Sequence, residues 1–475
     1  MSLRHLGFQG SGLLAKRGFL AFAFLAVARR LGPAAFGDFS YVSTWLLVFS
    51  LLLGLGLAPV STREIARSPE TAHRILKSGL SLRFGLSFSG VVLLNLLFAC
   101  TPVGRPGIGG YAFLASLCLP PLAFADQISA YALGLDAHHQ FALVNGTVWG
   151  LYFAATAGAL ALGGGLGSVF AGQLIFVWLA ALICGYWLHE DLARSARLAD
   201  SWGTSVFLLR EAAPLVITSV LGILSFRIGT FLLYRFGGST ETGLYTSALQ
   251  VVEGMQLIAM AVTGALFPAL CRLAAGGREM NDLCENLFLS LAFLGLAVAT
   301  LVSVIGRPLV AFFFGPSFDP AGRLLAILIW SSVPMFLHYG LTFVLIAVNR
   351  QRVFVFETAI YLLASLTANL ILIHKYAALG AVYAALLSES ALLGMHLYFV
   401  ASRLNLARTL AWAALPAAIA ALVLAFGVSW GPEINATLVN RLAFCLASVA
   451  LFAAGYGLYR RFAPSQRPAL AVPAV

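Results

Sequence analysis

The chain has 475 residues, of which 60% are hydrophobic and only 10% are charged, and its mean hydropathy is +0.93. Soluble domains carry about 25% charged residues, and a soluble chain could not cover so much apolar surface. The composition therefore excludes soluble enzymes, nucleic-acid-binding proteins and disordered scaffolds. It predicts a polytopic integral membrane protein.

A membrane-spanning helix needs about 20 mostly apolar residues, because about 30 Å of hydrocarbon is crossed at about 1.5 Å per residue. Fourteen segments meet this requirement: 12–29, 39–61, 79–100, 111–134, 141–162, 166–188, 211–235, 243–270, 286–306, 321–348, 353–374, 378–401, 410–429 and 439–459. These runs are continuously apolar rather than alternating, which favours helices over the strands of a barrel. We therefore expect an all-α polytopic membrane protein with about 14 transmembrane helices.

The distribution of basic residues predicts the orientation, because Lys and Arg collect in cytoplasmic loops. With the N-terminus inside, 20 of the 29 Lys and Arg residues fall on the cytoplasmic side, 8 fall outside, and Arg227 lies within a span. Arg83 is counted on the inner side. The asymmetry predicts that both termini are cytoplasmic, and it explains the net charge of +11 without any nucleic acid.

An internal repeat links the two halves of the chain. A shift of 213 positions aligns features of the fourth to sixth spans with the tenth to twelfth, and a shift of 206 aligns Gly32 and Gly37 with Gly238 and Gly243. Each repeat of six spans enters the membrane in the same direction. We therefore expect two six-helix lobes related by a pseudo-two-fold axis normal to the membrane.

The repeat predicts the division of the chain into domains. The expected parts are an N-terminal lobe at 1–190, a cytoplasmic linker at 191–210, a C-terminal lobe at 211–402, and two appended helices with a cytoplasmic tail at 403–475. The loops are short throughout, so no soluble catalytic domain is expected.

Three groups of sequence phrases resemble a known family. The first group is Ala-Arg-Arg-Leu-Gly-Pro-Ala-Ala-Phe-Gly at 28–37 with Thr-Arg-Glu-Ile-Ala-Arg at 62–67. The second group is Glu-Ala-Ala-Pro-Leu at 211–215, Gly-Leu-Tyr at 243–245 and Phe-Pro-Ala-Leu at 267–270. The third is Phe-Gly-Pro-Ser-Phe at 314–318. Over residues 10–400 or so, the chain resembles the polysaccharide-transport flippases of the multidrug/oligosaccharidyl-lipid/polysaccharide exporter superfamily.

The resemblance implies a bacterial inner-membrane protein. It would turn undecaprenyl-diphosphate-linked repeat units of O-antigen, as in lipopolysaccharide, or of exopolysaccharide from the cytoplasmic to the periplasmic leaflet by alternating access. The resemblance also implies an ion gradient as the source of energy and a polysaccharide polymerase as a possible partner. No nucleotide or other cofactor is expected, because the sequence has no Gly-x4-Gly-Lys-Ser/Thr phosphate loop, and no Cys/His spacing indicates a metal site.

Arg227 is the clearest candidate for contact with an anionic cargo. An ionisable residue in hydrocarbon costs at least about 2.5–3.5 kcal/mol on insertion scales, so it usually faces a cavity or a partner. Thr230 and Tyr234 share its helical face, and a guanidinium binds phosphate through two hydrogen bonds. We expect these three residues to hold the diphosphate, with Lys16 and Arg17 at the cytoplasmic mouth of the first span. The alternative is that Arg227 snorkels or pairs with a carboxylate, and that Lys16 and Arg17 only orient the first span.

Ionisable residues in other spans are candidates for ion coupling. They are Asp126, Glu253, Glu389 and His396. His396 lies seven residues after Glu389 on one helical face, an arrangement that suits a proton relay. The alternative for each is a structural contact between helices. Glu357 is expected to reach water near the inner end of its span, and His338 is expected to be a packing residue.

Two other transport functions stay open. A cation-coupled multidrug exporter of the same superfamily would use the intramembrane acids, whereas Arg227 favours an anionic cargo. A peptidoglycan lipid-precursor flippase is a close variant of the leading hypothesis. An enzyme is not expected, because the short outer loops offer neither paired catalytic carboxylates nor a nucleophile–base pair.

Overall fold

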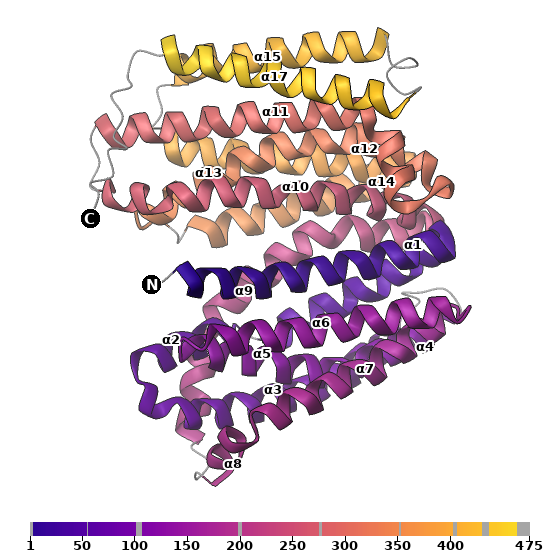
Figure 1. Ribbon diagram of the computed structural model, residues 1–475, viewed down its shortest axis with the longest axis vertical. Helices are drawn as coiled ribbons and strands as arrows, with labels where there is room; N and C mark the ends of the chain where they lie inside the picture. The colour runs from indigo at the N-terminus through magenta and orange to yellow at the C-terminus, as the bar shows by residue number, and fades with distance from the viewer. Residues whose placement is uncertain are drawn as a thin grey trace. The chain divides into compact units, whose positions relative to one another are not determined.

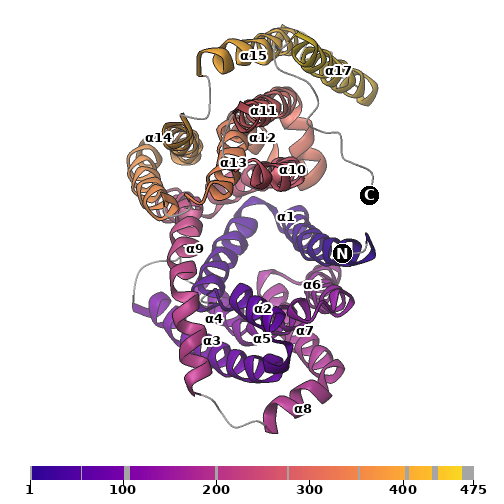
Figure 2. The same ribbon diagram turned by 90° about the vertical axis from the view of Figure 1, so that its left-hand side faces the viewer.

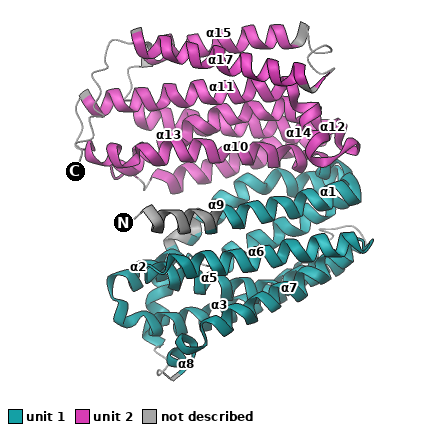
Figure 3. Ribbon diagram, viewed as in Figure 1, with its two compact units in different colours: residues 1–243 teal, residues 244–475 magenta. Residues whose placement is uncertain are grey.

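The computed structural model describes residues 3–54, 56–100, 107–197, 202–274, 278–350, 353–401, 406–429 and 437–462. Within these ranges the regular secondary structure is helical and no strand is present (Figure 1). The chain forms two compact units, residues 1–243 and 244–475 (Figure 3). The prediction of an all-α protein is confirmed.

The helices of the first unit follow one another with short connections. They are α1 (Leu3–Gly54), α2 (Leu57–Arg67), η1 (Pro69–Thr71), α3 (Ala72–Cys100), α4 (Ile108–Ser116), α5 (Leu119–Gly134), α6 (His138–Ala161), α7 (Leu166–Trp187), α8 (His189–Arg197) and α9 (Trp202–Phe236). Buried apolar side chains from α2, α3, α5, α6 and α7 form a shared core in this unit.

The helix α1 bends sharply at Gly32 and forms two arms (Figure 2). Gly32 has φ 77°, a left-handed conformation that glycine adopts without steric cost, and Pro33 begins the second arm. The ring of Phe24 lies 4.8 Å from that of Phe39. A continuous helix would separate these residues by about 22 Å, so the arms fold back on each other.

The helices of the second unit begin with α10 (Gly238–Arg272), whose first residues belong to the first unit. The others are α11 (Arg278–Phe314), η2 (Pro316–Phe318), α12 (Asp319–Leu328), η3 (Ile329–Ser331), α13 (Ser332–Ala347), α14 (Val353–Val400), α15 (Leu406–Ser429) and α17 (Leu438–Phe462).

The helix α14 also consists of two arms, which meet at Ala377 (φ 48°, ψ −124°). The hydroxyl of Tyr361 donates a hydrogen bond to Oε1 of Glu389 across 2.7 Å. A continuous helix would separate these residues by about 42 Å. The two arms therefore lie side by side in opposite directions.

The predicted membrane spans coincide with helices. Ten helical segments of the described chain are long and apolar enough to cross a membrane. Two of them contain the bent helices α1 and α14 and supply two spans each. The helices α6 and α15, of 24 residues each, coincide with two further predicted spans but are not among these ten segments. The chain is a multi-pass membrane protein.

The glycines aligned by the sequence repeat have matching roles. Gly32 and Gly238 both have positive φ, 77° and 82°, and each precedes the second span of its half. Gly37 and Gly243 pack against each other's helices: a Cβ on Gly37 would lie 1.8 Å from the carbonyl oxygen of Ser239, and one on Gly243 would lie 1.9 Å from that of Pro33. The backbones of α1 and α10 meet here without side chains between them.

The lobe boundaries at 190, 210 and 402 stay a prediction. The compact units group the chain by contacts and assign α9 to the first unit, whereas the repeat assigned residues from 211 onward to the second lobe. Residues 198–201 of the predicted linker and 463–475 of the predicted tail lie outside the described residues.

We expect Gly37→Ala to destabilise the protein. The added methyl group overlaps the backbone carbonyl oxygen of Ser239, so one of the two helix backbones would have to move. Overpacking of this kind costs about 1–3 kcal/mol, enough to lower the thermal midpoint by about 1–3 °C in a chain of this length. Thermal unfolding of purified protein in detergent measures the change. The control is Gly85→Ala in α3, where no atom lies within 4 Å of the new Cβ; an equal loss there would contradict the assignment of Gly37.

Candidate functional site

In the first unit, Lys16 and Asp126 lie together. The Nζ atom of Lys16 on α1 is 3.9 Å from Oδ1 of Asp126 on α5, and it lies 5.0 Å from the centre of the Trp149 ring on α6. The two side chains are 37% and 44% exposed, so their attraction is worth about 1 kcal/mol or less. Sequence reasoning gave these residues separate roles, and the structure makes them partners. Arg17, the next residue on α1, is exposed.

Arg83, which the sequence count placed with the cytoplasmic charges, is a buried cation. It lies 11 residues into α3, about 17 Å along the helix from its first residue, and it is 3% exposed. Its Nε atom has no hydrogen-bond partner among the described residues, and the charge of Asp126 acts on it. The sequence signal was its position inside the predicted span 79–100.

The face of α9 that carries Arg227 packs against the second arm of α1. Thr230 is fully buried, and Tyr234 is 3% exposed. The Tyr234 hydroxyl donates a hydrogen bond to Oδ1 of Asp38 across 2.7 Å, and its ring stacks on that of Tyr41 at 3.9 Å. Thr230 and Tyr234 thus take part in helix packing.

Arg227 itself is half-buried. Its guanidinium lies 5.5 Å from the ring centre of the neighbouring Phe226. Of the three residues on this face, Arg227 is the one that keeps partial access. A role in binding cargo stays a prediction for all three residues.

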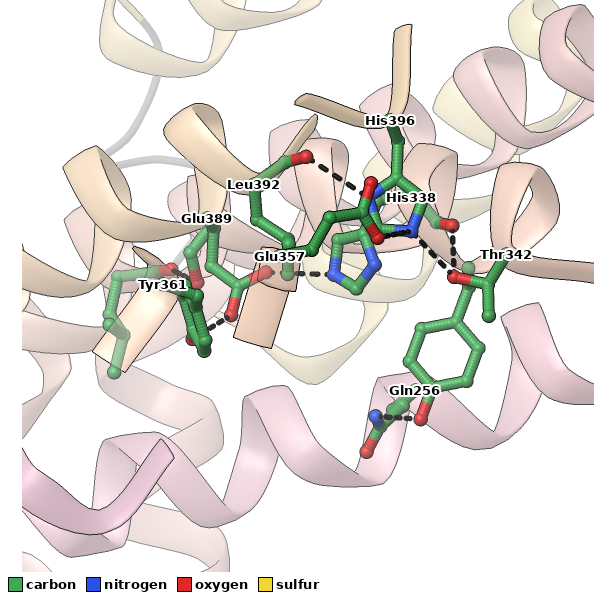
Figure 4. Close-up of polar contacts among 11 residues, drawn as sticks. Gln256, His338, Thr342, Glu357, Tyr361, Glu389, Leu392 and His396 are labelled. Atoms are coloured by element: carbon green, nitrogen blue, oxygen red, sulfur yellow. Dashed lines mark hydrogen bonds and ion pairs between the residues drawn. The ribbon is translucent and has the colours of Figure 1, made fainter. Parts of the chain in front are cut away.

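In the second unit, Glu389 is held by two hydrogen bonds between helices (Figure 4). Its Oε1 accepts from Tyr361 at 2.7 Å, and its Oε2 lies 2.9 Å from Nε2 of His338 on α13. Glu389 is 6% exposed and His338 is 9% exposed. The ring of His338 is thus buried and satisfied by the carboxylate of Glu389, as expected of a packing residue.

A second pair lies beside the first. The Nε2 atom of His396 is 3.0 Å from Oγ1 of Thr342 and 3.6 Å from Oε2 of Glu357, and its Nδ1 is 3.0 Å from the carbonyl oxygen of Leu392 (Figure 4). Glu357 is 1% exposed, so the expectation that it reaches water is wrong. The α14 hairpin encloses it.

The geometry of the hairpin explains why these groups meet. Glu357 lies 20 residues before the bend at Ala377, and His396 lies 19 residues after it. Residues at similar distances from a hairpin turn face each other across antiparallel arms. Glu389 and His396, predicted to act together, belong to one network of polar contacts. His338 of α13 bonds to Glu389, and Thr342 of α13 bonds to His396. The ring centres of His338 and His396 are 5.5 Å apart.

Glu253 lies elsewhere in the second unit. It is half-buried on α10, three residues before Gln256, whose amide nitrogen donates a hydrogen bond to the Tyr339 hydroxyl. Across the described part of the chain, no group of three or more His, Cys, Asp or Glu side chains is placed to hold a metal ion.

A bundle of membrane-length helices with ionisable groups buried inside it is a polytopic membrane protein of the transporter-like class. A family model described as "Polysaccharide biosynthesis protein" matches residues 8–274, more than half of the chain. The chain belongs to this family. A search of curated proteins finds no match.

Solved structures share the fold at low sequence identity. One is titled lipid II flippase MurJ in an inward closed conformation (TM-score 0.74, 12% identity, 96% of this chain and 99% of that chain covered). Another is an inward-facing multidrug resistance MATE family transporter of the MOP superfamily (TM-score 0.64, 18% identity, 82% and 94% covered). A third is a MOP superfamily transporter from Pyrococcus furiosus (TM-score 0.57, 17% identity, 84% and 95% covered). The resemblance drawn from the sequence is confirmed in family and fold.

We expect Tyr361→Phe to destabilise the second unit. The change leaves Oε1 of the buried Glu389 without its donor, and an unsatisfied buried acceptor costs about 1–3 kcal/mol. Thermal unfolding in detergent measures the loss. Tyr398→Phe, on the same helix but 78% exposed, is the matched control and should leave the midpoint unchanged. Equal midpoints for the two variants would mean that the Tyr361–Glu389 bond adds nothing to stability.

Proposed function

We propose that the chain moves undecaprenyl-diphosphate-linked oligosaccharide repeat units from the cytoplasmic to the periplasmic leaflet of the bacterial inner membrane, by alternating access. The product would serve a surface polysaccharide such as O-antigen or exopolysaccharide. The observation that carries the proposal is the family match over residues 8–274. It is supported by the number of helices long enough to cross a membrane.

The basic residues of the first unit suit the anionic part of this cargo. Lys16, Arg83 and Arg227 lie on helical segments long and apolar enough to cross a membrane, and in hydrocarbon a cation attracts a phosphate more strongly than in water. Lys16 and Asp126 hold each other loosely, so a diphosphate can replace the carboxylate as the partner of Lys16. Arg17 is exposed beside them. Thr230 and Tyr234 support Arg227 by fixing α9 to α1.

The remaining parts of the proposal follow the sequence analysis. Both termini face the cytoplasm, as the distribution of basic residues favours. An ion gradient supplies the energy, through acids in the membrane-spanning helices. A polysaccharide polymerase that consumes the translocated repeat units is the expected partner.

Two specific observations support alternative cargoes. The likeness to a structure titled lipid II flippase favours a peptidoglycan precursor, which has the same lipid-diphosphate chemistry. The likeness to multidrug resistance transporters favours a cationic drug. The cations Lys16, Arg83 and Arg227 weigh against the second alternative, because like charges repel in a medium of low dielectric constant.

We expect cells lacking the gene to accumulate complete lipid-linked repeat units in the cytoplasmic leaflet, and a wild-type copy to clear them. Arg227→Ala and Arg83→Ala should each reduce clearance by about tenfold or more, since a hydrogen bond to a charged group is worth about 1.5–3 kcal/mol. Leaflet-specific labelling of extracted lipid-linked saccharides measures the effect. The matched control is Arg74→Ala, an exposed arginine on the same helix as Arg83.

Normal arrival of repeat units in the periplasm, without a second flippase, would refute the cargo assignment. Drug export would then be assayed with the same variants. Normal clearance by both arginine variants, with a functional wild-type copy, would leave the cargo assignment standing and refute the cationic site.

A further inference from the structure

We propose that Glu357 and His396 form a proton-binding site between the two arms of α14, and that Thr342 relays its state to α13. The ligand is a single proton. Glu389, His338 and Tyr361 form a fixed layer beside this pair.

The two buried carboxylates differ in how they are satisfied. Both oxygens of Glu389 have hydrogen-bond partners, Tyr361 and His338. Neither oxygen of Glu357 has one, although Glu357 is 1% exposed, and its nearest charged partner is the imidazole of His396 at 3.6 Å. A buried carboxylate without donors is costly when ionised and unpaired. The Glu357–His396 pair therefore holds one proton, and Glu389 has no need of one.

The tautomer of His396 is defined. A carbonyl oxygen only accepts, so the contact with Leu392 fixes a hydrogen on Nδ1. Nε2 is then a bare acceptor that lies 3.6 Å from Oε2 of Glu357. In the loaded state one proton is bonded to Oε2 and directed toward Nε2, and both groups are neutral. Release returns that proton to water and leaves Glu357 as the anion.

Thr342 connects this change to α13. Its hydroxyl has one hydrogen and two acceptors within reach, the carbonyl oxygen of His338 at 2.8 Å and Nε2 of His396 at 3.0 Å. When Glu357 is ionised, the Thr342 hydroxyl can donate to the bare Nε2 atom, which makes a hydrogen bond from α13 to α14. When Glu357 is protonated, its carboxyl donates to Nε2 and the Thr342 hydroxyl donates to the carbonyl oxygen of His338. The protonation state thus selects the pattern of hydrogen bonds between the two helices.

The pair lies near the open end of the hairpin. Glu357 is four residues from Val353, where α14 begins, and His396 is four residues from Val400, where it ends. Both lie about 6 Å along the helix from these ends, whereas Glu389 lies about 17 Å deep. Protons from the side of the exposed Arg350, which we expect to be cytoplasmic, have the shorter path to Glu357.

Other titratable groups lie beside the pair on α13 and on α14 itself. The ring centre of His338 on α13 is 5.5 Å from that of His396, and Glu389 and Tyr361 of α14 are bonded to each other. The charge of Tyr245 on α10 acts on Tyr361. Both oxygens of Glu389 have hydrogen-bond partners, whereas neither oxygen of Glu357 has one.

Infrared difference spectroscopy tests the proton site directly. Purified protein in lipid is recorded in acidic and alkaline buffer, and the carbonyl stretch of a protonated carboxylic acid is followed. A buried group is distinguished by slow exchange in D₂O. We expect the wild type and Glu389→Gln to show this band, and Glu357→Gln to lose it. Glu70→Gln, an exposed carboxylate of η1, is the matched control and should retain it.

Three results would overturn the proposal. They are the absence of the band from the wild type, its persistence in Glu357→Gln, and its loss when NaCl replaces choline chloride at fixed pH, which would make the site a sodium site. Because Glu357→Gln keeps the size of the side chain, a matching thermal midpoint shows that the lost band reflects the missing acid and not unfolding.

The coupling experiment rests on the proposed function. In the leaflet assay, a gradient of one pH unit should change wild-type translocation by up to about tenfold for one coupled proton. Glu357→Gln and Thr342→Val should abolish this dependence, and Thr342→Ser, which keeps the hydroxyl, should restore it. Dependence that survives in Glu357→Gln would overturn the proposal. Failure of the cargo assignment is recognised separately, because the infrared band requires no cargo.

Discussion

The structure depends on one constraint: a polar group placed in hydrocarbon must find its partner inside the protein. For the backbone, this constraint selects helices, and the described residues form them throughout the spans. For side chains, it selects pairs from different helices. Lys16 meets Asp126, and Glu389 meets both His338 and Tyr361. Each of these ionisable groups therefore holds two helical segments together and is also available for binding or proton transfer.

Two sharp bends make such pairs possible. The bend at Gly32 lets the arms of α1 fold together, and the bend at Ala377 does the same for α14. Without the second bend, Glu357 and His396 would lie about 58 Å apart instead of 3.6 Å. Gly32 and Gly238, which the sequence repeat aligns, both have positive φ. The repeat therefore matches residues with the same backbone conformation as well as the same residue type.

Hydropathy is local, so the fourteen spans could be predicted from the sequence, whereas contacts between distant residues could not. Lys16 and Asp126 are 110 positions apart, and no local pattern joins them. The burial of Arg83 was not predicted, because counting charges per loop treats a cation near a span's end as facing water. Glu357 was expected to reach water because it lies near the end of its span, but it is buried. Pairing positions equidistant from the short turn at Ala377 would have brought Glu357 and His396 together in advance.

The two units differ in the sign of the charges that they bury. The first unit has a cation, Arg83, whose hydrogen bonds are incomplete, and this group attracts an anion. The second has a carboxylate, Glu357, whose hydrogen bonds are missing, and this group attracts a proton. An incompletely satisfied group destabilises the resting fold, and that cost falls when the ligand binds. A group whose only role is to hold helices together is most stabilising when all of its hydrogen bonds are made, as they are for Glu389. The missing hydrogen bonds of the Glu357 carboxylate are therefore the feature that separates a binding site from a structural contact.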